Sequence, residues 1–215
     1  VHGVSGTTFT AGCESTLGSS ANAFTAINGG RSNLIYNSAL NTIAFIHRGN
    51  PSGGVGTNSG DLFWDISTDG GATWNINQGP SYTVANGNLA RYPMGSIYNP
   101  AGNTDPANAW VAGFGSNTGG SGWISQTHCT SKLDGTNANQ EVQDFVQGGF
   151  MGDIPSSMET DNVGNVWVSD FQNDAVGSQA YGNTNLWLTK GVWNGGANKY
   201  DYTNIAMPFV ADLDP

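Results

Sequence analysis

Charged side chains are scarce in this chain, so the few that fall in its loops are the first candidates for chemistry. The sequence has 215 residues with six Lys plus Arg against sixteen Asp plus Glu. The Gly/Asn/Ser-rich connections and adjoining strand ends carry Arg31, Arg48, Arg91, Asp153 and Asp170. A guanidinium can hold a carboxylate through paired N–H bonds, so the arginines are candidates for binding an acidic ligand. The competing interpretation is that they are surface arginines beside loops.

Acids suited to general acid–base chemistry are scattered along the chain. Besides Asp153 and Asp170, the candidates are Glu159, Asp161 and Asp174. Acids in Asn/Gly-rich segments more often form turns than catalyse reactions. The segment Asp161–Asn165 has the composition of a turn between two strands. Such a turn could clip a Ca²⁺ ion, but it lacks the acids of a dedicated calcium loop. We therefore expect no cofactor and no metal site, with Ca²⁺ at this turn as the alternative.

The two cysteines, Cys13 and Cys129, allow two interpretations. They could form one long-range disulfide in an oxidising compartment or remain two buried thiols. We predict the disulfide, because the chain has the composition of a secreted protein. His128 precedes Cys129, but neighbouring side chains on a strand point to opposite faces, which argues against a catalytic Cys–His pair.

The bulk composition is that of short strands joined by turns. Glycine supplies 32 residues, aromatic residues 11% and charged residues only 10%, so we expect an all-β fold. The net charge of −10 disfavours nucleic acids and anionic lipid surfaces as partners. No apolar run approaches the roughly 20 residues that a membrane-spanning helix needs, so we expect a chain that does not span a membrane.

The clearest local pattern is a tight turn in the segment Ser67–Trp74. The aromatic and branched residues 61–66 before it indicate a strand. Asp69 can accept backbone N–H groups of the turn, and Gly70 and Gly71 can adopt the positive φ that the turn requires. Trp74 opens the returning strand. The pattern predicts a β-hairpin.

Around this hairpin the chain repeats. Residues 1–30 are expected to form an extended lead-in, and residues 31–79, 93–147 and 156–205 three units of four strands each. Trp64, Trp123 and Trp187 recur on the third strand of successive units. Residues 206–215 are expected to start a further strand, in a chain truncated there. Four strands per repeated unit are typical of propeller blades, with a β-sandwich as the alternative.

The spacing S-x-D-x-G-x-x-W resembles the Asp-box, or BNR repeat, of sialidase-type β-propellers, with Ser67, Asp69, Gly71 and Trp74 in its defining positions. The resemblance implies a structural role for these four residues, on the face away from the ligand site. It also implies a partial propeller of four-stranded antiparallel blades. Three blades do not close a ring, so we expect further blades or a partner polypeptide to complete it.

A second resemblance covers most of the chain. The order of its short motifs is similar to the propeller head of large secreted Bacteroidota proteins of the type IX secretion route. It rests on residues 21–24, 45–50, 67–74, 91–95, 98–103 and 132–137. This resemblance implies an extracellular or cell-surface location.

Together these features predict a non-catalytic module for binding or assembly, such as adhesion or contact with a glycan or a protein. The alternative is a sialidase-type glycoside hydrolase whose remaining catalytic residues lie outside this chain. An exo-sialidase needs an arginine cluster, a tyrosine nucleophile, a glutamate base and an aspartate acid. This chain contains only Arg31, Arg48 and Arg91 as arginines.

Overall fold

The structure is a computed structural model that describes residues 15–22, 32–119, 122–144, 157–173 and 183–208. It is all-β, with three four-stranded antiparallel sheets and two 3-10 helices in the described residues. The predicted all-β class with four-stranded antiparallel units is confirmed. None of the three described sheets closes on itself.

Each sheet is a meander in which neighbours in sequence pair in space. The first sheet contains β1 (Leu34–Asn37), β2 (Thr42–Arg48), β3 (Leu62–Ser67) and β4 (Asn75–Tyr82), with η1 (Pro51–Gly53) between β2 and β3. The second contains β5 (Leu89–Tyr98), β6 (Trp110–Gly119), β7 (Gly122–Lys132) and β8 (Asn139–Asp144), with η2 (Pro106–Asn108) between β5 and β6. The third contains β9 (Ser157–Thr160), β10 (Val166–Asn173), β11 (Asn183–Asn194) and β12 (Lys199–Pro208).

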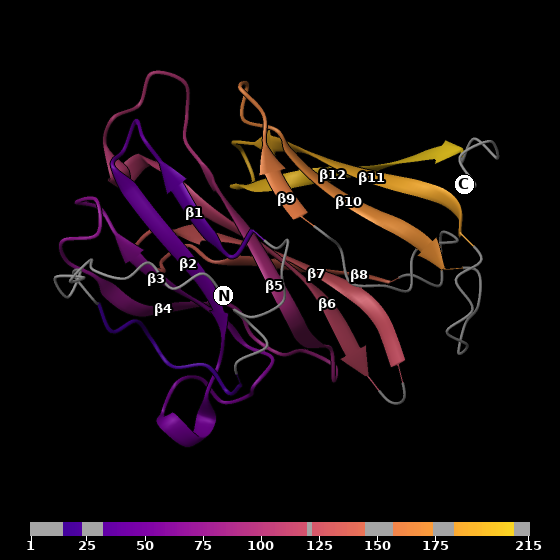
Figure 1. Ribbon diagram of the computed structural model, residues 1–215, viewed down its shortest axis with the longest axis horizontal. Helices are drawn as coiled ribbons and strands as arrows, with labels where there is room; N and C mark the ends of the chain where they lie inside the picture. Colours follow the sequence, from indigo (N-terminus) through magenta and orange to yellow (C-terminus); the bar gives the residue numbers. More distant parts are fainter. Residues whose placement is uncertain (1–14, 23–31, 120–121, 145–156, 174–182, 209–215) are drawn as a thin grey trace, which may run out of the picture.

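The second sheet lies between the other two (Figure 1) and buries side chains on both of its faces. On β6, Val111 belongs to the core shared with the first sheet, whereas Ala112 and Phe114 belong to the core shared with the third. This alternation follows from the two-residue period of a strand. A middle strand of such a stack therefore has an almost continuous apolar sequence.

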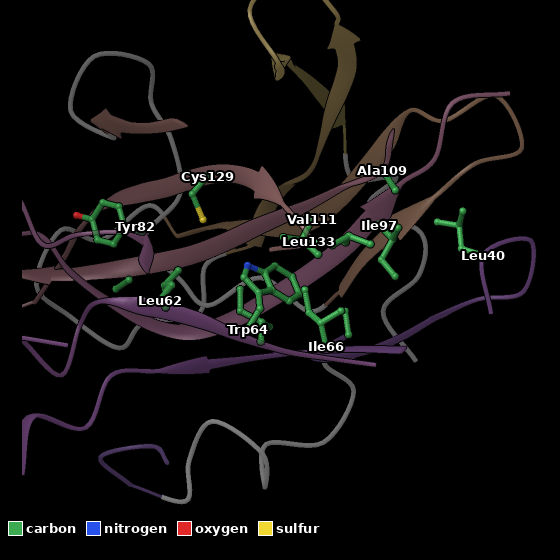
Figure 2. Packing of buried hydrophobic residues seen from close by; sticks show 13 residues of the cluster. Leu40, Leu62, Trp64, Ile66, Tyr82, Ile97, Ala109, Val111, Cys129 and Leu133 are labelled. Atoms are coloured by element: carbon green, nitrogen blue, oxygen red, sulfur yellow. The ribbon is translucent and has the colours of Figure 1, made fainter. Parts of the chain in front are cut away.

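The core between the first and second sheets is organised around Trp64 (Figure 2). Its side chain has no exposed surface, and its indole N–H donates to Ser81 Oγ at 3.2 Å. The ring lies against Gly95 of β5, where a Cβ atom would overlap the indole. The absence of a side chain at Gly95 thus lets a large aromatic residue of one sheet pack on the backbone of the next.

The first strands of the sheets lie side by side. Strand β5 contacts both β1 and β9. Ser32, just before β1, connects all three sheets: its carbonyl accepts the N–H of Gly95 at 2.7 Å, and its hydroxyl donates to Glu159 Oε1 at 2.8 Å. One edge of each sheet is therefore gathered at a common place.

The predicted hairpin at Ser67–Trp74 joins β3 to β4. Ser67 Oγ accepts the N–H of Gly71 at 2.7 Å, and Asp69 Oδ1 accepts the N–H of Thr73 at 2.9 Å. Gly70 and Gly71 have φ of 72° and 96°, the region that glycine adopts without steric cost. The Trp74 indole N–H donates to Gly71 O within the same turn. Hydrogen bonds to Thr73 and Ser67 lower the pKa of Asp69 to about 2.

Some strands extend further than the sequence indicates. The gap between the predicted units 31–79 and 93–147 is reduced to residues 83–88, because β4 continues to Tyr82 and β5 begins at Leu89. Similarly, β6 continues to Gly119, through the polar residues 115–119. The reason is a buried polar network: Asn117 Nδ2 donates to Ser125 Oγ at 2.9 Å, and Asn117 Oδ1 accepts from Thr127 Oγ1 at 2.7 Å. These residues satisfy one another across β6 and β7, so a polar sequence forms buried strand here.

Candidate functional site

Arg48 and Arg91 lie at one end of the first two sheets, where β2 ends and β5 begins. The hairpin at Ser67–Trp74 lies at the opposite end of the same sheet, because successive turns of a meander alternate between its two ends. The β2–β3 and β4–β5 connections lie at the end that contains the arginines, as do the last residues of β6 and the first residues of β7. Loops carried on a rigid sheet are where binding sites are usually built.

The two arginines converge on a single carbonyl oxygen, Ser59 O in the β2–β3 connection. Arg48 Nε donates to it at 2.8 Å, and Arg91 Nη1 donates to it at 3.4 Å and to Ala90 O at 3.0 Å. Arg48 is only 4% exposed, whereas Arg91 is half-buried. The fold thus brings together two arginines that are far apart in the sequence.

No acidic side chain neutralises this pair within the described residues. The ion pairs found there, within 4.0 Å, are His47–Asp65 and Lys199–Glu141. Burial, and then the nearby charge of Arg91, lower the pKa of Arg48 to about 10. Burial likewise lowers the pKa of Arg91. Two partly desolvated cations that are close together favour binding of an anion that would neutralise them.

An aromatic pair lies next to the arginines. Tyr92 follows Arg91 directly and packs against Trp123 at the start of β7, with ring centroids 5.8 Å apart and planes at 54°. Tyr92 has φ of 48°, and the β5–β6 register shifts between Arg91 and Met94. A bulge of this kind redirects side chains and is common next to functional sites. The irregular strand thus gives the arginine pair an aromatic neighbour.

Asp61 holds the connection that presents Ser59. This carboxylate is buried, and it accepts the N–H groups of Thr57 and Asn58 through Oδ2 and that of Val84 through Oδ1, each at 2.9 Å. The loop before β3 is thereby tied to the β4–β5 connection. Gly60 allows the close contact, since a Cβ there would lie 2.9 Å from Leu89 Cα. The arginine site therefore has a rigid support.

A buried His–Asp pair, His47–Asp65, lies on the outer face of the first sheet. His47 Nε2 is 3.3 Å from Asp65 Oδ1, although the angle is not that of a hydrogen bond. Asp65 also accepts the N–H groups of Gly18 and Asn77 at 2.7 and 2.8 Å. Burial would raise the pKa of Asp65, but His47 and these two amides lower it overall. The pair anchors residues 15–22 to the sheet, so we assign it a structural role.

Of the residues predicted for the ligand face, the structure brings Arg48 and Arg91 together. Asp170 lies in β10 of the third sheet, where its backbone pairs with Trp187. Arg31 and Asp153 lie outside the described residues. The arrangement was predicted only in part, because the sequence analysis did not single out Ser59, Asp61 or the Tyr92–Trp123 pair. The one local signal was that Tyr92 follows a candidate arginine.

The carboxylate of Asp161 accepts hydrogen bonds within its own turn and from the strand that follows. Asp161 accepts the N–H groups of Val163 and Asn165, the Asn165 side-chain amide and the Trp167 indole N–H, at 2.8 to 3.1 Å. The indole contact is the largest of the effects that lower the pKa of Asp161 to about 2. No cluster of three or more His, Cys, Asp or Glu that could hold a metal occurs among the described residues.

Cys129 is buried, and its Sγ lies 3.4 Å from Ser81 Oγ. Its expected disulfide partner, Cys13, lies outside the described residues, so that pairing stays a prediction. Burial raises the pKa of Cys129 to about 11. As expected, Cys129 and His128 face opposite sides of β7: Cys129 packs in the core with the first sheet, whereas His128 contacts Tyr202 of the third.

Comparison with known proteins identifies no matching family model, no matching curated protein and no matching solved structure. Across the described ranges, no helix is long and apolar enough to cross a membrane.

Proposed function

We propose that this protein is an extracellular or cell-surface binding module in which Arg48 and Arg91 hold the carboxylate or sulfate group of an acidic glycan. The observation that carries the proposal is the convergence of both guanidinium groups on Ser59 O, with no carboxylate within 4.0 Å of either in the described residues. A bidentate contact to an anion would use guanidinium N–H groups other than those bonded to Ser59. The Tyr92–Trp123 pair supplies an apolar surface for a sugar ring.

We further propose that the three sheets are blades of a partial, sialidase-like β-propeller. The consecutive face-to-face packing of the sheets and the gathering of β1, β5 and β9 support this arrangement. The outer face of the first sheet exposes Leu34 and Tyr36 (61% and 58%), and that of the third exposes Val192 and Ile205 (48% and 42%). Further blades, or a partner polypeptide, would cover these apolar faces. The motif resemblances add the proposal of secretion by the type IX route.

We prefer binding over catalysis as the function because the carboxylate of Asp61 is already occupied by hydrogen bonds. A sialidase-type glycoside hydrolase, the alternative, needs a carboxylic acid that can reach the substrate. Asp61 is the buried acid at this end of the sheets, and backbone N–H groups occupy both of its oxygens. Its position therefore indicates a structural role in the site.

The test is a comparison of Arg48→Gln and Arg91→Gln with Lys132→Gln, a matched loss of charge at the end of β7 near the hairpin tips. Calorimetric titration with a sialylated oligosaccharide, a glucuronate-terminated one, a sulfated one and neutral lactose would identify the anion. We expect the parent to prefer one anionic sugar. Each arginine variant should lose at least about tenfold in affinity, or about 1.4 kcal/mol.

The Lys132→Gln variant should bind like the parent, and thermal melts would confirm that every variant folds. Equal affinity of the parent for lactose and for the anionic sugars would contradict the proposal, as would unchanged binding by both arginine variants. Release of free sugar during the titration would instead support the hydrolase.

A further inference from the structure

His128 is a buried imidazole placed where the second and third sheets meet. It projects from β7 and is 5% exposed. Its ring lies edge-on to Phe114, with centroids 4.7 Å apart, and 4.0 Å from the ring of Tyr202 on β12. Within the described part of the chain, no atom lies in hydrogen-bonding geometry to either ring nitrogen or to the buried Tyr202 hydroxyl.

The charged and titratable groups around His128 come from each strand packed against it. Strand β8 contributes Glu141 and β12 contributes Lys199, which form an exposed ion pair at 2.8 Å across the same two sheets. Strand β12 also contributes Tyr200 and Tyr202, and β8 contributes Gln143. Cys129, on β7 itself, lies on the opposite face. A small pocket lined by Glu141, Lys199 and Tyr202 borders His128.

We propose that the contact between the second and third sheets is acid-sensitive, and that it is released when His128 takes up a proton. A charged imidazolium at this position would be buried against two aromatic rings, with no atom of the described residues in hydrogen-bonding geometry to either N–H, which is costly. Separation of β12 from β7 would give the imidazolium access to water. The proposal is independent of anion binding, because the arginine site is built on the first and second sheets.

The direction of the effect follows from proton linkage. Burial, the largest influence, lowers the pKa of His128 from its ordinary value of 6.5 to about 4; Glu141 and Gln143 raise it and Lys199 lowers it further. In a state with His128 exposed, the imidazole takes up a proton below about pH 6.5. The packed state cannot do so until about pH 4, so acidification between these values favours separation of the sheets. A shift of this size changes the equilibrium on the order of 100-fold.

The other buried histidine, His47, has different groups around its ring nitrogens. Its Nδ1 lies 3.0 Å from the carbonyl of Arg48, and its Nε2 faces Asp65. His47 therefore has an acceptor near each nitrogen, whereas His128 has none in hydrogen-bonding geometry among the described residues. We therefore assign the acid response to the contact of the third sheet.

The test is hydrogen–deuterium exchange of the full 215-residue chain at pH 7 and pH 4.5, corrected for intrinsic exchange rates. In the parent, peptides from residues 183–208 should lose protection at pH 4.5, whereas peptides from residues 34–82 keep theirs. The His128→Phe variant should remove this difference. The Glu141→Gln variant is the matched control: it removes the ion pair but keeps the imidazole, so its acid response should persist.

An acid response that persists in His128→Phe, or that disappears in Glu141→Gln, would overturn the proposal. If His128→Phe does not fold, NMR titration of the parent decides the matter. The imidazole in contact with Tyr202 should remain neutral until the third sheet loses protection. Protonation near pH 6.5 with the sheets still packed would refute the mechanism.

Discussion

The packing of Trp64 on Gly95 predicts a compensating pair of substitutions between the first two sheets. A Cβ at Gly95 would overlap Cη2 of the Trp64 indole and lie 2.9 Å from its Cζ3. Both atoms belong to the outer edge of the indole, which has no counterpart in phenylalanine. Gly95→Ala alone should therefore destabilise the fold by about 1–3 kcal/mol through overpacking. In a Trp64→Phe background the same methyl group should fit.

The size of each effect follows from the burial of Trp64. Trp64→Phe removes part of a fully buried ring and the bond from its indole N–H to Ser81 Oγ, which should cost about 2–3 kcal/mol. If the two changes were independent, the double variant would lose as much unfolding free energy as the two single variants together. We expect the double variant to lose no more stability than Trp64→Phe alone. This difference corresponds to a coupling energy of at least about 1 kcal/mol.

Chemical denaturation of the parent, both single variants and the double variant measures this coupling. The matched control is Gly113→Ala, because a Cβ at Gly113 would lie 2.8 Å from both Cys129 Sγ and Ile46 Cδ1 but 3.6 Å from Trp64 Cζ2. Its cost should remain the same in the Trp64→Phe background. If the stability losses of Gly95→Ala and Trp64→Phe simply add in the double variant, the packing of the first sheet on the second is refuted.

Two further predictions concern the hairpin and the buried thiol. Asp69→Ala should lower stability, because Thr73 loses its acceptor, and it should leave anion binding unchanged. The stability that Asp69 contributes should be present above about pH 4 and should disappear as the pH falls toward 2. Equal denaturant midpoints for Asp69→Ala and the parent would contradict this role. Cys129 should resist alkylation at pH 8 in the folded protein, because burial raises its pKa to about 11. It should react once the protein is unfolded if it is a free thiol. Modification of Cys129 in the native protein, mapped by mass spectrometry, would contradict its burial.

The elements of this fold could be predicted because their signals are local. The apolar runs of residues 43–46 and 109–114 each indicate a strand without reference to any other part of the chain. The Ser67–Trp74 turn is closed by its own side chains and by two glycines with positive φ. The length of β6 could not be predicted, because Asn117 finds its partners Ser125 and Thr127 only after β6 and β7 pair.

The sequence by itself therefore determined the all-β class, the four-stranded units and the hairpin chemistry, because these depend on residues near one another in the chain. Only the tertiary structure decided which charged residues meet. Arg48 and Arg91 converge because Gly60 allows the β2–β3 connection to touch β5 and Asp61 holds it there. Likewise, nothing near His128 in the sequence indicates that its ring lies against Tyr202, 4.0 Å away in the third sheet. These contacts depend on how one sheet is placed on the next, which is set by packing between distant residues.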